Sequence, residues 1–395
     1  MSECGEKRRC GEDGTDPRAW FAGMVPRCYE HAKAAKAAGR PVVGIMCEYT
    51  PRELILAAGG VPVCLCGGSA QMIPVAEQEL PANLCPLVKS TYGYFLAKAN
   101  PFLEMADLLV AETTCDGKKK MYERLARGKP MHVIELPQKP DEPEALGRWL
   151  AELRKLKRAL EERFGTAIGD GALRAAIRSM NRERALRRNL ASILKQDRPA
   201  LTGRELLEMK SLISCMDGDL AQYAAAHARF AAEKPADGWP HPVRVLLTGV
   251  PHAHGAERVM ELIEANGGLV VCQENCTGLK PLLDDVDEAA ADPLEAIARK
   301  YLDLPCSVMT PNGRRIDLLR KLAREYRAEC VVDLVWQACL TYDVESPFVR
   351  EAAEGLSLPC LKIETDYSPS DTARLALRVQ ALFETAAGRR AERPA

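Results

Sequence analysis

The stretch Met105-Ala-Asp-Leu-Leu-Val-Ala-Glu-Thr-Thr-Cys-Asp-Gly117 joins a short apolar run to a polar turn that carries a cysteine. The apolar run, which ends at Val110, is typical of a strand buried on both faces of a parallel sheet. The turn contains Cys115, and residues 118–128 after it are predicted to form a helix. We therefore expect Cys115 just beyond the carboxyl end of a strand, where open α/β sheets hold their ligands.

The C-terminal half of the chain repeats this pattern. Val331-Val-Asp-Leu-Val-Trp-Gln-Ala-Cys339 is again an apolar strand, a short polar exit and a cysteine. A second cysteine beside a proline precedes each stretch: Cys85 lies 30 residues before Cys115, and Cys306 lies 33 residues before Cys339. The repetition indicates an internal duplication in which each half places two cysteines at equivalent strand ends.

The order of strand and helix signals predicts an α/β fold with two Rossmann-like parallel-sheet domains and a helical insertion domain between them. We expect a disordered tail over 1–16, a first α/β domain with an N-terminal helix over 17–143, a helical domain over 144–234, and a second α/β domain over 241–387. One helix start is predicted at Thr50-Pro-Arg-Glu53, which has the form of a capping box with Thr50 as N-cap.

Composition narrows the function classes. A chain of 395 residues is suited to two or three domains. Its formal net charge of −1 gives no bulk attraction to nucleic acid or to a membrane surface, and an aromatic content of 5% argues against base stacking. Residues 1–10 lack the apolar core of a secretory signal, and no apolar run approaches the length of a membrane span. We expect a cytoplasmic protein.

Fifteen cysteines are many for a compartment in which thiols stay reduced, so metal or redox chemistry is favoured over disulfides. The chain has no Cys-x-x-Cys, which argues against zinc ribbons and thioredoxin-like sites. Soft thiolates select zinc, copper(I) or iron–sulfur clusters. Six cysteines are predicted at strand ends or in loops, too many for one tetrahedral zinc: Cys47, Cys85, Cys115, Cys276, Cys306 and Cys339. Two cubanes with three thiolates each would use all six, although any one of them alone could be a small buried hydrophobe.

The other cysteines are interpreted as packing residues. Cys64, Cys66 and Cys272 are predicted inside strands. The same interpretation applies to cysteines on helices or at strand starts, namely Cys28, Cys215, Cys330 and Cys360.

Three further patterns have alternative explanations. His252 and His254 follow a strand in the loop equivalent to that of Cys47, where they could ligate a metal or be solvated. The run 118–120 of three lysines opens a helix near Cys115, as a solvated face or as an anchor for an anionic ligand or a partner. No phosphate-binding loop or dinucleotide fingerprint is present, so the sequence shows no ATP or NAD site.

Four motifs carry a family resemblance: Glu274-Asn-Cys-Thr-Gly-Leu-Lys-Pro281, Leu304-Pro-Cys-Ser-Val-Met-Thr-Pro-Asn312, Leu334-Val-Trp-Gln-Ala-Cys339 and Leu361-Lys-Ile-Glu-Thr-Asp-Tyr-Ser368. They resemble the 2-hydroxyacyl-CoA dehydratase / benzoyl-CoA reductase superfamily, and within it the double-cubane cluster proteins. The resemblance covers nearly everything from about residue 17 to residue 387.

The resemblance implies a cofactor and partners. Dehydratase subunits of this kind hold one [4Fe–4S] cluster through three cysteines, whereas double-cubane members use six cysteines for an [8Fe–9S] cluster. The latter are homodimers that reduce small molecules with low-potential electrons from an ATP-hydrolysing iron–sulfur activator. By the same similarity Cys85, Cys115 and Cys339 would hold one cubane, which leaves Cys47, Cys276 and Cys306 for the other.

Three functions therefore stand as expectations. The first is a reductase component with a double-cubane cluster. The second is a 2-hydroxyacyl-CoA dehydratase subunit with a single [4Fe–4S] cluster, which acts by ketyl-radical elimination. The third is a non-catalytic electron carrier or cluster-carrying protein. About eight irons per chain would support the first function and about four the second. No catalytic residue is predicted, and the substrate is not identified.

Overall fold

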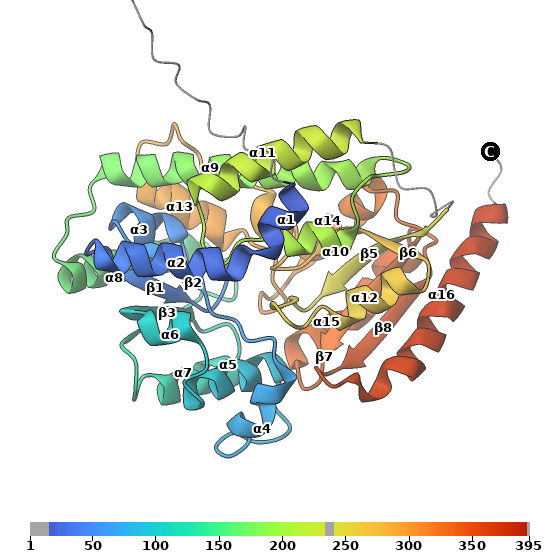
Figure 1. Cartoon of the computed structure of the whole chain (residues 1–395), viewed down its shortest axis with the longest axis horizontal. Helices are drawn as coiled ribbons and strands as arrows, with labels where there is room; N and C mark the ends of the chain where they lie inside the picture. The colour runs from blue at the N-terminus through green and yellow to red at the C-terminus, as the bar shows by residue number, and fades with distance from the viewer. Residues whose placement is uncertain (1–15, 234–240, 393–395) are drawn as a thin grey trace, which may run out of the picture.

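The computed structural model describes residues 16–233 and 241–392 (Figure 1). The tail predicted over 1–16, with Cys4 and Cys10, lies outside the described residues except for Asp16, which caps the first helix. The N-terminal sheet has the order β2-β1-β3-β4, and all its neighbours are parallel. Its strands are β1 (Val42–Ile45), β2 (Val61–Cys64), β3 (Leu108–Glu112) and β4 (Met131–Ile134).

A second parallel sheet repeats this topology. Its order is β6-β5-β7-β8, which is the same relative order as in the first sheet. Figure 1 shows the first sheet on the left and the second on the right. The strands are β5 (Val243–Gly249), β6 (Gly268–Glu274), β7 (Cys330–Trp336) and β8 (Cys360–Thr365). The predicted α/β class with two Rossmann-like parallel sheets is confirmed.

Helices cover the first sheet and supply its core side chains. They are α2 (Met24–Ala37), α3 (Arg52–Ala57), α4 (Ile73–Ala76), α5 (Pro86–Leu96), α6 (Pro101–Met105) and α7 (Asp116–Leu125). The first helix, α1 (Pro17–Ala22), packs instead on helices of the segment between the two sheets. The capping box predicted for α3 is wrong. Pro51 is the N-cap, and the hydroxyl of Thr50 instead donates to Glu112 on β3. Glu53 is buried against Arg184 rather than turned back to its own helix start.

The segment between the two sheets is helical. Its helices are α8 (Ala145–Phe164), α9 (Asp170–Ser192), α10 (Gly203–Glu208) and α11 (Asp217–Ala232). Among residues 144–233 the only β pairing is one isolated bridge from Ile213 to Val63. Figure 1 shows α9 and α11 side by side across the top of both sheets. None of the helices in the described ranges is long and apolar enough to span a membrane.

The C-terminal half contributes α12 (Arg258–Ala265), α13 (Pro293–Leu302), α14 (Gly313–Glu325), α15 (Leu340–Glu354) and α16 (Thr372–Glu392). Of these, α13 packs on α8 and α9 of the helical segment rather than on its own sheet. Tyr301 of α13 and Trp149 of α8 belong to one buried cluster with Val43 and Ile45 of β1. Tyr49, just after β1, donates to the carbonyl of Leu304 at 2.8 Å. These contacts join the first sheet to α13 and to the loop after it in the C-terminal half.

Candidate functional site

Three of the six predicted cysteines occupy helix N-termini. Cys85 is the N-cap of α5, Cys115 of α7 and Cys339 of α15. At this position the first backbone N–H groups have no partner within the helix, and they can donate to an anionic atom. We call Cys85, Cys115 and Cys339 the helix-cap triad.

The thiols of the helix-cap triad influence one another. A hydrogen bond with Cys339 lowers the pKa of Cys85, and the same contact raises the pKa of Cys339. Burial raises the pKa of Cys115, and the charge of Cys339 adds to this effect. The sulfur of Cys115 also accepts the backbone N–H of Lys118 at 3.4 Å. The fold therefore brings together thiols from both halves of the chain.

The other three cysteines lie in loops. Cys47 follows β1, Cys276 follows β6, and Cys306 follows α13. Burial raises the pKa of Cys47, and the charges of Cys276 and Cys306 raise it further. Burial likewise raises the pKa of Cys276 to about 12, although Lys280 opposes it. These mutual effects place Cys47, Cys276 and Cys306 near one another.

Three lysines surround this second group. The ammonium of Lys118 donates to the carbonyl of Met46 at 2.9 Å, beside Cys47. Lys210 lies 3.3 Å from a carboxylate oxygen of Glu48 and 3.4 Å from the carbonyl of Cys276. Lys280 is 3% exposed, and its ammonium lies 3.0 Å from Glu274 Oε1. We call Cys47, Cys276 and Cys306 the lysine-flanked triad.

A buried ionic network supports the lysine-flanked triad. Arg315 is fully buried and donates to Glu274 Oε2 at 3.2 Å, to Thr248 Oγ1 at 2.8 Å and to Glu345. Lys280 approaches the other oxygen of Glu274. Burial alone would raise the pKa of Glu274, yet Lys280 and Arg315 hold it below its usual range. Charges buried this deeply persist only when they are paired, so the network fixes the end of β6 that leads to Cys276.

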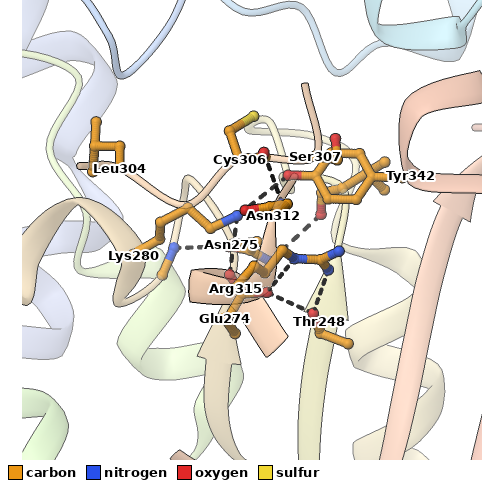
Figure 2. Close-up of polar contacts among 12 residues, drawn as sticks. Thr248, Glu274, Asn275, Lys280, Leu304, Cys306, Ser307, Asn312, Arg315 and Tyr342 are labelled. Carbon is orange, nitrogen blue, oxygen red and sulfur yellow. Dashed lines mark hydrogen bonds and ion pairs between the residues drawn. The ribbon is translucent and has the colours of Figure 1, made fainter. Parts of the chain in front are cut away.

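The same network holds the backbone of Cys306. Asn312 Nδ2 donates to the carbonyl of Cys306 at 2.9 Å and to Glu345 Oε1 at 2.6 Å. Figure 2 shows these contacts, with Cys306 and Asn312 above the Glu274 carboxylate. Cys306 is 8% exposed. Both loop cysteines of the second half therefore rest on one set of buried hydrogen bonds.

A cavity of about 110 Å³ adjoins the lysine-flanked triad. Its lining includes Cys47 and Cys276 together with Lys118 and Lys210. Its walls come from both α/β halves and from the helical segment, to which Leu212 of the lining belongs. A void of this size beside two thiols is room for a compact inorganic group.

The interpretation of Cys64 and Cys66 as residues inside a strand is wrong for Cys66. Strand β2 ends at Cys64, and both thiols are half-buried and line the cavity. A hydrogen bond with Cys66 lowers the pKa of Cys64 to about 6. The Cys-x-Cys spacing was a usable signal, because residues two apart in an extended chain point to the same side. Cys272, by contrast, is buried within β6 at 2% exposure, as expected of a packing residue.

Burial shows which of the two histidines and which of the three consecutive lysines face the interior. His252 is buried and lines the cavity, and burial lowers its pKa to about 4, whereas the side chain of His254 is 65% exposed. Of the three consecutive lysines, only Lys118 turns inward. Lys119 and Lys120 are exposed and pair with Asp116 and Glu123 on their own helix.

Glu112 is a site residue that the sequence reasoning missed. It ends β3, is fully buried, and accepts a hydrogen bond from Thr50, while its second oxygen has no partner among the described residues. Burial raises its pKa to about 8, although Lys118 opposes the shift. This carboxyl is therefore largely protonated at neutral pH and can give up a proton near Cys47.

The donor set fits clusters better than a single ion. Among residues 16–233 and 241–392, no three His, Cys, Asp or Glu side chains converge on a position for one metal ion. A cubane does not require this, because each of its irons takes a separate thiolate. Two groups of three soft thiols, one of them beside a cavity, match that requirement.

The chain is similar in sequence to dehydratase subunits over nearly its whole length. The family model described as 2-hydroxyglutaryl-CoA dehydratase, D-component, matches residues 47–386. YjiM of Escherichia coli (strain K12), provisionally named a dehydratase subunit, is 41% identical over 88% of this chain and 92% of its own length. The beta subunit of (R)-phenyllactyl-CoA dehydratase from Clostridium sporogenes is 22% identical over 89% of this chain and 94% of its own.

A reductase component is also similar. One of the subunits of benzoyl-CoA reductase from Thauera aromatica is 25% identical, over 87% of this chain and 89% of its own length. Among solved structures, the periplasmic heme-binding protein BhuT covers 88% of this chain and 97% of its own, at 13% identity. Its TM-score of 0.19 is too low to carry an argument.

Proposed function

Since this chain belongs to the 2-hydroxyglutaryl-CoA dehydratase D-component family, we propose that it is an iron–sulfur reductase component that carries an [8Fe–9S] double-cubane cluster. The observation that supports the proposal is that the six cysteines fall into two groups of three, in each of which the thiols lie close enough to shift one another's pKa. A dehydratase subunit that holds a single cubane has use for only one triad. Here the lysine-flanked triad has a buried hydrogen-bond network of its own.

In this proposal the two triads hold the cluster by different means. Cys85, Cys115 and Cys339 would be held as thiolates by helix N-termini. Cys47, Cys276 and Cys306 would be held among the ammonium groups of the surrounding lysines. When bound, the cluster would supply low-potential electrons to a small molecule.

Residues of this chain would handle the proton and exclude water. Glu112 is buried, and its pKa of about 8 keeps it largely protonated at neutral pH, so it is our candidate for a proton donor near Cys47. Residues of three segments line the cavity, and its volume of about 110 Å³ would suit a small group. A water molecule occupies about 30 Å³ in the liquid, so the space corresponds to a few waters.

The proposal includes two protein partners. The sequence has no phosphate-binding loop, so an ATP-hydrolysing iron–sulfur activator would supply the electrons. The relatives from Clostridium sporogenes and Thauera aromatica are named as subunits, which supports assembly with another chain. We propose a homodimer, as the resemblance to double-cubane cluster proteins implies, and in this proposal the six cysteines of one chain need no ligand from a different subunit.

The alternative is a 2-hydroxyacyl-CoA dehydratase subunit. The name of the Clostridium sporogenes relative favours it, as does the helix-cap triad, which could hold a single cubane alone. In that case a thioester would be bound beside the helix-cap triad, and the lysine-flanked cysteines would hold no iron.

Iron counting decides between these functions. The protein is loaded with iron and sulfide under anaerobic conditions, and iron is measured per chain alongside Cys360→Ser as a control outside both triads. About eight irons supports the proposal, and about four irons with no loss in Cys306→Ser supports the dehydratase alternative. Turnover of small oxidants with an ATP-coupled activator then separates an enzyme from a non-catalytic carrier.

A further inference from the structure

Lys118 contacts both triads through different atoms. Its backbone N–H donates to the sulfur of Cys115 at 3.4 Å, in the helix-cap triad. Its ammonium reaches in the other direction and donates to the carbonyl of Met46 at 2.9 Å, beside Cys47 of the lysine-flanked triad. Lys118 also lines the cavity that Cys47 and Cys276 share. One residue therefore spans the boundary between the two candidate halves of the site.

The ammonium of Lys118 forms no salt bridge among the described residues. Within the described part of the chain, Lys118 has no carboxylate within salt-bridge distance, whereas Lys119 and Lys120 each have one on α7. Two neighbouring carboxylates are already paired, since Glu48 contacts Arg52 at 2.7 Å and Glu274 contacts Lys280 and Arg315. A third carboxyl, Glu112, is kept largely neutral by burial. The Lys118 ammonium is thus a cation without a salt-bridge partner beside Cys47, and its charge also reaches Cys115 at the start of its own helix.

The helix-cap triad has a different electrostatic environment. Its three thiols lie at the N-termini of α5, α7 and α15, and the thiol of Cys115 accepts a backbone N–H there. The charges at a helix N-terminus are partial charges shared among several amides. A full ammonium charge in a partly desolvated site acts more strongly at short range than such dipoles. The two halves are therefore unequal in the charge that they present.

We propose that Lys118 is a positioning residue whose ammonium makes the Cys47–Cys276–Cys306 half the first to accept an electron. This inference rests on the proposed double-cubane function. An added electron makes the bound group more negative, and a fixed cation beside one half favours the electron there. The helix-cap half then carries the more negative reduction potential and lies on the donor side of an electron path that ends at the cavity.

The test compares neighbouring lysines on one helix. Lys118→Met removes the inward-facing charge, Lys119→Met removes an exposed charge one residue away, and Lys118→Arg keeps the charge. Each protein is loaded with iron anaerobically, its iron is counted, and its reduction is followed by visible and electron paramagnetic resonance spectra during a dye-mediated titration. We expect full iron in all three and a shift of one reduction step to more negative potential in Lys118→Met alone.

Each outcome has a defined meaning. An unchanged potential in fully loaded Lys118→Met overturns the inference, and so does an equal shift of both steps. Loss of iron in Lys118→Met with full loading of Lys118→Arg also overturns the inference, because the charge would then be needed to bind the cluster and not to order its reduction. Loss of iron in both variants shows that side-chain shape is decisive and overturns the inference. Failure of the proposed function itself appears earlier, as about four irons or none in the wild-type protein.

Discussion

The helix-cap triad and the lysine-flanked triad each consist of three cysteines, but different parts of the structure surround their thiols. The first places each cysteine at the start of a helix, where the N-terminal N–H groups have no partner within the helix and one of them donates to Cys115. The second places its cysteines in loops, where side chains from distant segments provide lysine cations and a buried arginine network. The surroundings of a cysteine can thus be set locally by backbone geometry or remotely by tertiary packing, and the two arrangements should fail differently when altered.

The largest expected effect comes from removing a thiol in each triad. Cys339→Ser and Cys306→Ser should each lose at least the iron held by their own triad, from about eight to about four irons per chain or fewer. The measurement is iron and sulfide content after anaerobic loading. Cys360→Ser lies at the start of β8, outside both triads, and should load fully. Full iron in either triad variant would mean that the triad is not a ligand set.

The second largest effect is expected from removing Arg315, the centre of the buried network that supports the lysine-flanked triad. Arg315→Leu leaves Glu274 and Glu345 buried without their shared guanidinium, which should cost about 3–5 kcal/mol of the free energy of unfolding. Urea denaturation of the metal-free protein measures it. Arg320→Leu on the same helix, where Arg320 is exposed and pairs only with Asp317, should change the free energy by about 0.5 kcal/mol or less. Equal midpoints for the two variants would contradict a structural role of the network.

The third prediction concerns pH and the carboxyl that lies near Cys47. Burial raises the pKa of Glu112 to about 8 from an ordinary value of 4.5, so folding favours its neutral form. The stability that this preference contributes is fully present below pH 4.5 and is lost as pH rises through 8. Glu112→Gln is always neutral and should therefore gain stability over the wild type progressively between pH 5 and pH 8, as roughly bounded by these pKa values.

Chemical denaturation of the metal-free protein across that pH range checks the prediction. The control is Glu123→Gln on α7, whose carboxylate is exposed and pairs with Lys120, and which should show no such rise. A constant difference between Glu112→Gln and the wild type would show that Glu112 is ionised throughout.

The smallest expected effect is the loss of one backbone support for the lysine-flanked triad. Asn312→Ala removes the donors to the Cys306 carbonyl and to Glu345, at a cost of about 1–3 kcal/mol, as is typical when buried acceptors lose a partner. Thermal unfolding of the metal-free protein measures it against Asn189→Ala, an exposed position on α9. An effect no larger than that of Asn189→Ala would mean that the loop of Cys306 is held by other contacts.

Much of the site was predictable because its elements are local. An apolar run, a polar exit and a cysteine place Cys115 and Cys339 at strand ends without knowledge of the tertiary fold, and the duplication predicts the second sheet from the first. The capping box at Thr50 failed for a non-local reason. A buried acceptor on β3, Glu112, competes for the same hydroxyl, and no local pattern reveals it.

By itself the sequence determined the α/β class, the two parallel sheets and the six candidate cysteines, because hydrophobic period and strand-end position are properties of short segments. Only the tertiary structure decided which of three consecutive lysines turns inward, that Cys64 and Cys66 border the cavity, and that Glu112 is kept neutral by burial. These outcomes depend on what packs against each side chain from residues far away in the chain. Desolvation and ion pairing are set by that packing, and local sequence does not encode them.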